Sequence, residues 1–196
     1  MPRAKKNINY VACLESLWDD GIIENDQRAN VVPILELLSK NVEDFKFSHL
    51  TCNTRGELEY NLEALKKLKK KKQYGILYLS FHGEPGYIHL ADETKISLEE
   101  LADLFGQRFS DWVIHFGSCG TVDVEKERLT QFVEATQVLL VSGYTQSVDW
   151  IESAAMDLLF FSYLLHYIDM KAMWKSLHSR SESLIKATGL VINYGK

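Results

Sequence analysis

Short apolar segments alternate along the chain with longer segments whose apolar residues recur three or four positions apart. Apolar or β-branched segments of strand length predict strands at residues 8–13, 45–51, 75–81, 112–116, 137–142 and 190–194. Helical spacing of the apolar positions predicts helices at residues 30–38, 55–70, 97–105, 129–134, 149–166 and 170–186. Residues 87–90 follow Glu84-Pro85-Gly86 and predict one arm of a hairpin.

This alternation of strands and helices determines the fold class that we expect. Strands that alternate with helices form a mostly parallel sheet with helices on both faces. We therefore predict an α/β protein, a three-layer α/β/α sandwich around a mostly parallel sheet of about six strands. No linker rich in Gly, Ser or Pro divides the sequence, so we expect a single domain over residues 1–196.

Composition and charge narrow the function classes. Hydrophobic residues make up 46% of the chain and charged residues 25%, the balance of a soluble globular protein. The net charge of −5 argues against a nucleic-acid surface. The most apolar stretch, residues 151–168, is interrupted by Glu152, Asp157 and His166 and is shorter than a membrane span, so we expect no membrane partner.

The cysteines and the N-terminus indicate the compartment. Three cysteines, an odd number without dense spacing, favour a reducing environment, and residues 1–6 are not followed by an apolar signal-peptide segment. We expect a cytoplasmic protein. The sequence lacks the spacings typical of metal ligands and a phosphate-binding loop, so we expect neither a metal nor another cofactor.

Two predicted strands end in polar residues flanked by glycine. His82-Gly83 follows one apolar strand, and Gly117-Ser118-Cys119 follows the next. Loops at the carboxyl ends of parallel strands collect in one crevice, so we expect both motifs on the same side of the sheet. A cysteine peptidase needs a thiolate nucleophile, an imidazole that moves the proton, and donors for the oxyanion. We assign Cys119, His82, and the backbone amides of Gly83 and Cys119 to these roles.

The two motifs resemble those of the caspase-like cysteine peptidases, the group of caspases, legumains, gingipains and separases, and most closely the CHAT-domain proteins of bacteria. In that group a His-Gly follows one apolar strand and a Cys follows the next, in the order that Phe81-His82-Gly83 and Gly117-Ser118-Cys119 show here. The resemblance covers residues 8–166 and implies a caspase-like fold and a protein or peptide substrate. Gly120 after the cysteine departs from the caspase motif, so preference for Asp substrates does not transfer.

A further segment supplies a hypothesis on specificity. Residues 142–149, Ser-Gly-Tyr-Thr-Gln-Ser-Val-Asp, resemble the CHAT and separase segment that ends in an acidic specificity residue. This resemblance implies that Ser142, Gly143 and Asp149 bind substrate, with Asp149 selecting Arg or Lys on the acyl side of the cleaved bond. Asp149 is equally suited to cap the helix that starts there. Only residues 121–128 separate Cys119 from the next helix, which argues against activation by internal cleavage and leaves control by a protein partner as an alternative.

Two other functions remain open. A catalytically silent caspase-like module would keep the fold and bind a partner without turnover. A Cys-dependent amidotransferase or DJ-1-like hydrolase also places a Cys after a strand, but its His follows the Cys, whereas His82 precedes Cys119 here. Cys13 and Cys52 lack neighbouring glycines, and His115 lies within a predicted strand and not at its end, so we interpret all three as buried structural residues. The sequence leaves the oligomeric state open.

Overall fold

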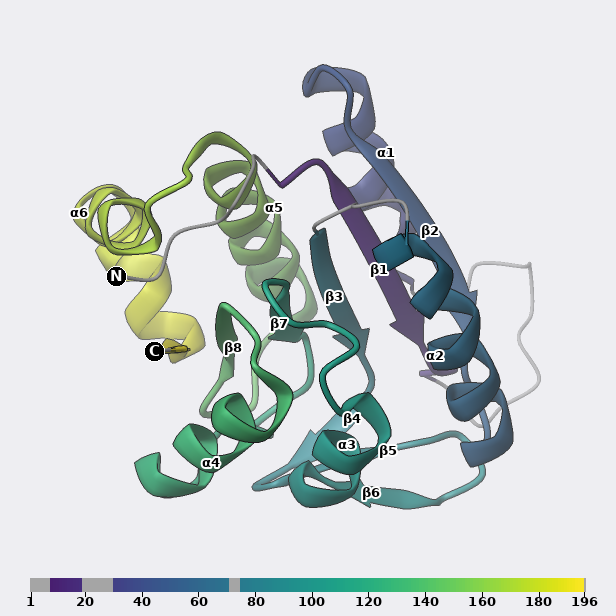
Figure 1. The fold of residues 1–196 in the computed structure, drawn as a ribbon. Helices are drawn as coiled ribbons and strands as arrows, with labels where there is room; N and C mark the ends of the chain where they lie inside the picture. Colours follow the sequence, from purple (N-terminus) through teal and green to yellow (C-terminus); the bar gives the residue numbers. More distant parts are fainter. Residues whose placement is uncertain (1–7, 19–29, 71–74, 196) are drawn as a thin grey trace, which may run out of the picture.

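A six-stranded sheet forms the centre of the protein (Figure 1). The computed structural model describes residues 8–18, 30–70 and 75–195, and the basic N-terminal residues 1–6 lie outside these ranges. Within the described residues the strand order is β2-β1-β3-β7-β8-β9. The strands are β1 (Tyr10–Glu15), β2 (Lys46–Thr51), β3 (Gly75–Ser80), β7 (Val113–Phe116), β8 (Leu140–Tyr144) and β9 (Leu190–Tyr194).

The strands β2, β1, β3, β7 and β8 are parallel, and β9 pairs antiparallel with β8 at one edge. The central strands β1, β3 and β7 are buried along their whole length because helices cover both faces. In β3, side chains alternate between the two faces: Leu77 and Leu79 belong to one core cluster, and Ile76 and Tyr78 to the other. Because β2, β1, β3, β7 and β8 are parallel, their carboxyl ends all lie at one edge of the sheet.

Three helices cover each face of the sheet among the described residues. One core cluster contains apolar side chains of α2 (Arg55–Lys70), α3 (Leu98–Phe105) and α4 (Lys126–Thr136). The other contains side chains of α1 (Val32–Asn41), α5 (Trp150–His166) and α6 (Met170–Thr188). None of the helices in the described ranges is long and apolar enough to cross a membrane.

A small antiparallel sheet follows β3 and extends from the same edge. It consists of β4 (His82–Glu84), β5 (Tyr87–His89) and β6 (Lys95–Ser97), in that order. Its last strand leads into α3 through a capping box, in which Ser97 and Glu100 satisfy each other's backbone N–H groups. His82 is therefore the first residue of a short strand that leaves the main sheet.

These observations confirm the predicted fold class. All six predicted helices and all six predicted strands are present, with ends that differ by at most three residues. The three-layer α/β/α arrangement and the mostly parallel six-stranded sheet are as predicted. The predicted hairpin arm at residues 87–90 proves to be the middle strand of the small sheet, whose flanking strands β4 and β6 the pattern did not reveal because three residues show no clear period.

Candidate active site

His82 and Cys119 follow strands that lie side by side in the sheet. Strands β3 and β7 pair in parallel, with Leu79 opposite Phe116. The pairing continues one step past β7, where the backbone N–H of Gly117 donates to the carbonyl of Leu79 at 2.9 Å. This register brings the His82 and Cys119 segments to the same edge of the sheet, as the sequence predicted.

The two segments also touch directly. A Cβ atom built on Gly83 would lie 2.7 Å from the backbone oxygen of Cys119 and 2.2 Å from Oγ1 of Thr121, so only glycine fits there. The hydroxyl of Thr121 donates to the carbonyl of Tyr87 at 2.9 Å. The backbone carbonyl of Thr121 accepts from the N–H of Gly86 at 3.0 Å. These bonds fasten the cysteine turn to the small sheet that begins with His82.

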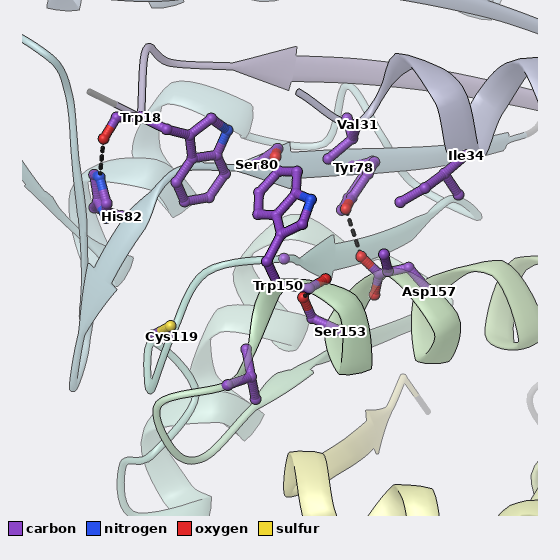
Figure 2. A pocket seen from close by; sticks show the side chains of 13 residues that line it. Trp18, Val31, Ile34, Tyr78, Ser80, His82, Cys119, Trp150, Ser153 and Asp157 are labelled. Carbon is purple, nitrogen blue, oxygen red and sulfur yellow. Dashed lines mark hydrogen bonds between the residues drawn. The ribbon is translucent and has the colours of Figure 1, made fainter. Parts of the chain in front are cut away.

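His82 and Cys119 line one pocket of about 190 Å³. Figure 2 shows them at one end of the pocket, with Asp157 at the other end and the ring of Trp150 between. The His82 side chain is exposed and Cys119 is half-buried, so both are accessible to a ligand. The whole lining consists of Trp18, Val31, Ile34, Tyr78, Ser80, His82, Gly117, Cys119, Val148, Trp150, Ser153, Ala154 and Asp157.

A backbone carbonyl orients the imidazole. Nε2 of His82 lies 3.0 Å from the carbonyl oxygen of Trp18, just beyond the end of β1 (Figure 2). A carbonyl oxygen only accepts hydrogen bonds, so Nε2 must carry the proton, and Nδ1 of the neutral ring is left as a free base. The indole of Trp18 also meets the imidazole edge-on, with ring centroids 4.9 Å apart. Trp18 therefore determines both the tautomer and the ring position of His82.

The far end of the pocket contains a buried carboxylate. Asp157 on α5 is only 2% exposed, and its oxygens accept from the hydroxyls of Tyr78 and Tyr144 and contact Nε2 of His115 at 2.8 Å. Burial, and next the negative charge of Asp157, raise the pKa of both tyrosines well above the usual value. The tyrosines therefore remain donors that hold this carboxylate at the end of the pocket.

The predicted specificity residues do not belong to the lining of this pocket. Ser142 and Gly143 lie inside the buried strand β8, where Ser142 Oγ contacts Nδ1 of His115 at 2.9 Å. Asp149 is exposed and caps α5, accepting from the backbone N–H groups of Ile151 and Glu152 at 2.8 and 3.2 Å. The cap interpretation of Asp149 is confirmed, and the three residues are not part of the pocket lining.

The interpretation of the remaining Cys and His residues as structural agrees with their placement. Cys13 and Cys52 are buried, and burial is the main cause that raises the pKa of Cys52 to about 11. His115 is fully buried with a partner at each ring nitrogen. Among the residues that the structure describes, no group of three or more His, Cys, Asp or Glu side chains could hold a metal ion.

Sequence reasoning missed two residues of the site, Trp18 and Asp157. Trp18 orients His82 through a backbone carbonyl, which every residue possesses, and through an indole that meets a residue far along the chain, so its local sequence gave no signal. Asp157 did carry a signal, because a carboxylate inside the apolar stretch of α5 requires buried donors. Its position in the sequence did not indicate that those donors come from β3, β7 and β8.

The architecture is that of the caspase-like fold class. The crystal structure of the Drosophila initiator caspase Dronc is similar, with a TM-score of 0.60 and 12% sequence identity, covering 98% of this chain and 82% of that chain. At this identity the similarity shows the fold alone. The chain belongs to a family of unknown function, DUF6642, whose model matches residues 8–194. No curated protein matches the sequence.

Proposed function

We propose that this protein is a cysteine endopeptidase with a Cys119-His82 dyad. The observation that carries the proposal is that the two side chains line one pocket, at the ends of paired central strands whose following turns are in contact. A dyad requires a thiol and a base in one accessible cleft. The Trp18 carbonyl adds support, because it leaves Nδ1 of His82 as the nitrogen that is able to accept a proton.

In the proposed reaction, Nδ1 of His82 accepts the proton of the Cys119 thiol, and the sulfur attacks the peptide carbonyl carbon. The imidazolium then donates that proton to the leaving amine as the C–N bond breaks, which leaves a thioester. Water attacks the thioester, its hydroxyl stays on the acyl group, and its proton returns through His82 to the sulfur. We expect the backbone amides of Gly83 and Cys119 to stabilise the oxyanion in both steps.

The proposal includes a preference for a basic residue before the cleaved bond. Both carboxylates already accept hydrogen bonds, Asp149 from helix amides and Asp157 from two tyrosine hydroxyls, but of the two only Asp157 belongs to the pocket lining. The indole rings of Trp18 and Trp150, 5.3 Å apart edge-on, line the same pocket and suit the aliphatic stem and cation of Lys or Arg. The placement of the two carboxylates therefore favours Asp157 as the specificity group.

Labelling tests the peptidase itself. A peptidyl electrophile should label Cys119 in the wild type and in Cys52→Ala, a matched control that removes a buried thiol, and should not label Cys119→Ala. Cleavage of a denatured protein substrate should fall at least about 10³-fold in Cys119→Ala and His82→Ala. Unchanged cleavage in both variants would refute the dyad. Labelling without cleavage would favour the silent interaction module, and release of ammonia from glutamine would favour the amidotransferase.

Matched peptides that differ only before the scissile bond test the specificity. The wild type should cleave the Arg and Lys peptides at least about 10-fold faster in kcat/KM than the norleucine peptide. Asp157→Asn should abolish this ratio, and Asp149→Asn should keep it. The reverse outcome would return specificity to Asp149, and equal cleavage of all peptides by the wild type would remove the basic preference.

A further inference from the structure

The chain buries a second carboxylate next to the candidate site, at the end of β1. Glu15 is 3% exposed, and a buried carboxylate is stable only when its oxygens are hydrogen-bonded. Its oxygens accept from the indole Nε1 of Trp18 at 2.8 Å, the backbone N–H of Val31 at 3.1 Å and the hydroxyl of Ser80 at 3.3 Å. Nε2 of His49 lies 2.5 Å from the other oxygen.

These partners come from different parts of the pocket wall. Trp18 follows β1, Val31 directly precedes α1, and Ser80 ends β3 two residues before His82. Trp18, Val31 and Ser80 all line the pocket, whereas Glu15 does not. The Glu15 carboxylate thus links three segments that surround the dyad. Among its hydrogen bonds to residues of the pocket lining, the shortest is to Trp18, which orients the imidazole of His82.

We propose that Glu15 is a positioning residue for His82. Its carboxylate fixes the indole of Trp18, which holds the Trp18 carbonyl oxygen against Nε2 of His82 and the indole ring against the imidazole edge. The effect on catalysis rests on the proposed peptidase function, whereas the effect on the ring of His82 does not. Glu15 touches neither the dyad nor the reacting atoms, so its role is exerted through Trp18.

The placement of His82 is read directly by NMR of the histidine ring protons. The indole of Trp18 lies close enough to shift these protons by its ring current. The shifts of His82, assigned by their absence in His82→Gln, should move toward free-histidine values in Glu15→Ala. Glu15→Gln keeps an acceptor for Trp18 and Val31 and should retain the wild-type shifts. Wild-type shifts in Glu15→Ala would overturn the proposal whether or not the protein is a peptidase.

Two further variants separate positioning from a purely structural role. Glu15→Asp shortens the side chain and withdraws the acceptor from the indole N–H while keeping the ring of Trp18, so it should also move the His82 shifts, and it serves if Glu15→Ala does not fold. The matched control is Asp169→Ala, because Asp169 also accepts two backbone N–H groups, those of Lys171 and Ala172, at the start of α6, and is not in the pocket lining. Asp169→Ala should leave the His82 shifts unchanged.

A double-mutant cycle tests the catalytic consequence. The rate of Cys119 alkylation by iodoacetamide and the kcat for peptide cleavage should fall about 10–10²-fold in Glu15→Ala and stay within about 3-fold in Glu15→Gln. In the His82→Gln background, Glu15→Ala should have no further effect, because the two residues act through one path. Equal losses in both backgrounds would show that Glu15 acts independently of His82 and would overturn the proposal. If His82→Gln itself changes neither rate, the proposed function fails, and the NMR result still decides the role of Glu15.

Discussion

Replacing Gly83 by alanine tests the contact that joins the two halves of the site. The added methyl would lie 2.7 Å from the carbonyl oxygen of Cys119 and 2.2 Å from Oγ1 of Thr121. Ordinary contact begins at 3.4 Å, so the carbonyl contact alone requires a displacement of about 3.4 − 2.7 = 0.7 Å. The Thr121 hydroxyl also resists displacement, because it is 2.7 Å from Ser118 Oγ and donates to the carbonyl of Tyr87.

The displacement changes both activity and stability. It separates the β4 segment that begins with His82 from the turn that contains Cys119. Misplacement of catalytic groups by about 1 Å costs roughly 10²-fold in rate, so we expect Gly83→Ala to lose about 10 to 10²-fold in kcat/KM. Overpacking of a buried contact costs about 1–3 kcal/mol, which should appear as a lower free energy of unfolding.

Cleavage kinetics and urea denaturation of the same preparation measure both effects. The matched control is Gly56→Ala in the first turn of α2, where a Cβ meets nothing within 4 Å. There we expect unchanged kcat/KM and a gain of about 0.5–1 kcal/mol, because alanine is favoured over glycine in a helix. A Gly83→Ala variant with wild-type stability and rate would refute the close packing of the two turns.

Three other predictions concern stability. Asp149→Ala removes the cap of α5 and should lower the free energy of unfolding by about 1 kcal/mol in urea; no change would contradict the cap. Leu35→Ala leaves a cavity at a fully buried position and should lower the free energy of unfolding in urea by about 2–5 kcal/mol. Leu37→Ala, at an exposed position of the same helix, should lower it far less, and equal losses would contradict the burial of Leu35. Backbone and side-chain hydrogen bonds from Ser97, with the Arg55 bond, lower the pKa of Glu100 from 4.5 to about 2. The contribution of these bonds to the free energy of unfolding is therefore fully present above pH 4.5 and is lost as the pH falls toward 2. If a Glu100→Gln variant lost the same free energy of unfolding as the wild type over this pH range, the result would contradict this.

The buried parts of the fold could be predicted because burial leaves a pattern in the sequence. The strands β3 and β7 are almost continuously apolar, and a polar residue that ends such a run stands out. The amphipathic helix α2 was predicted with its observed ends because its apolar residues form a regular stripe. The flanking strands β4 and β6 escaped prediction because three residues are too few to establish a period.

The same reasoning explains why specificity was harder to predict than the dyad. His82 and Cys119 lie next to the strands that position them, so local sequence placed both residues. The pocket beside them is assembled from segments far apart in the chain, and its buried carboxylate, Asp157, is supported by hydroxyls from β3 and β8. Local sequence does not reveal these contacts, because they depend on which face of α5 packs against which face of the sheet.

Glu15 shows how a residue's role follows from its contacts and not from its type. Glu15, His82 and Cys119 are all polar residues at the carboxyl ends of the central strands, and each is a plausible candidate for chemistry by position alone. Glu15 is removed from catalysis because its oxygens are saturated by Trp18, Val31, Ser80 and His49 and it does not line the pocket. His82 and Cys119 remain open to a ligand, and only groups with that freedom are able to exchange protons and bonds with a substrate. At this edge of the sheet, Glu15 therefore supports the site, whereas His82 and Cys119 are the groups able to react in it.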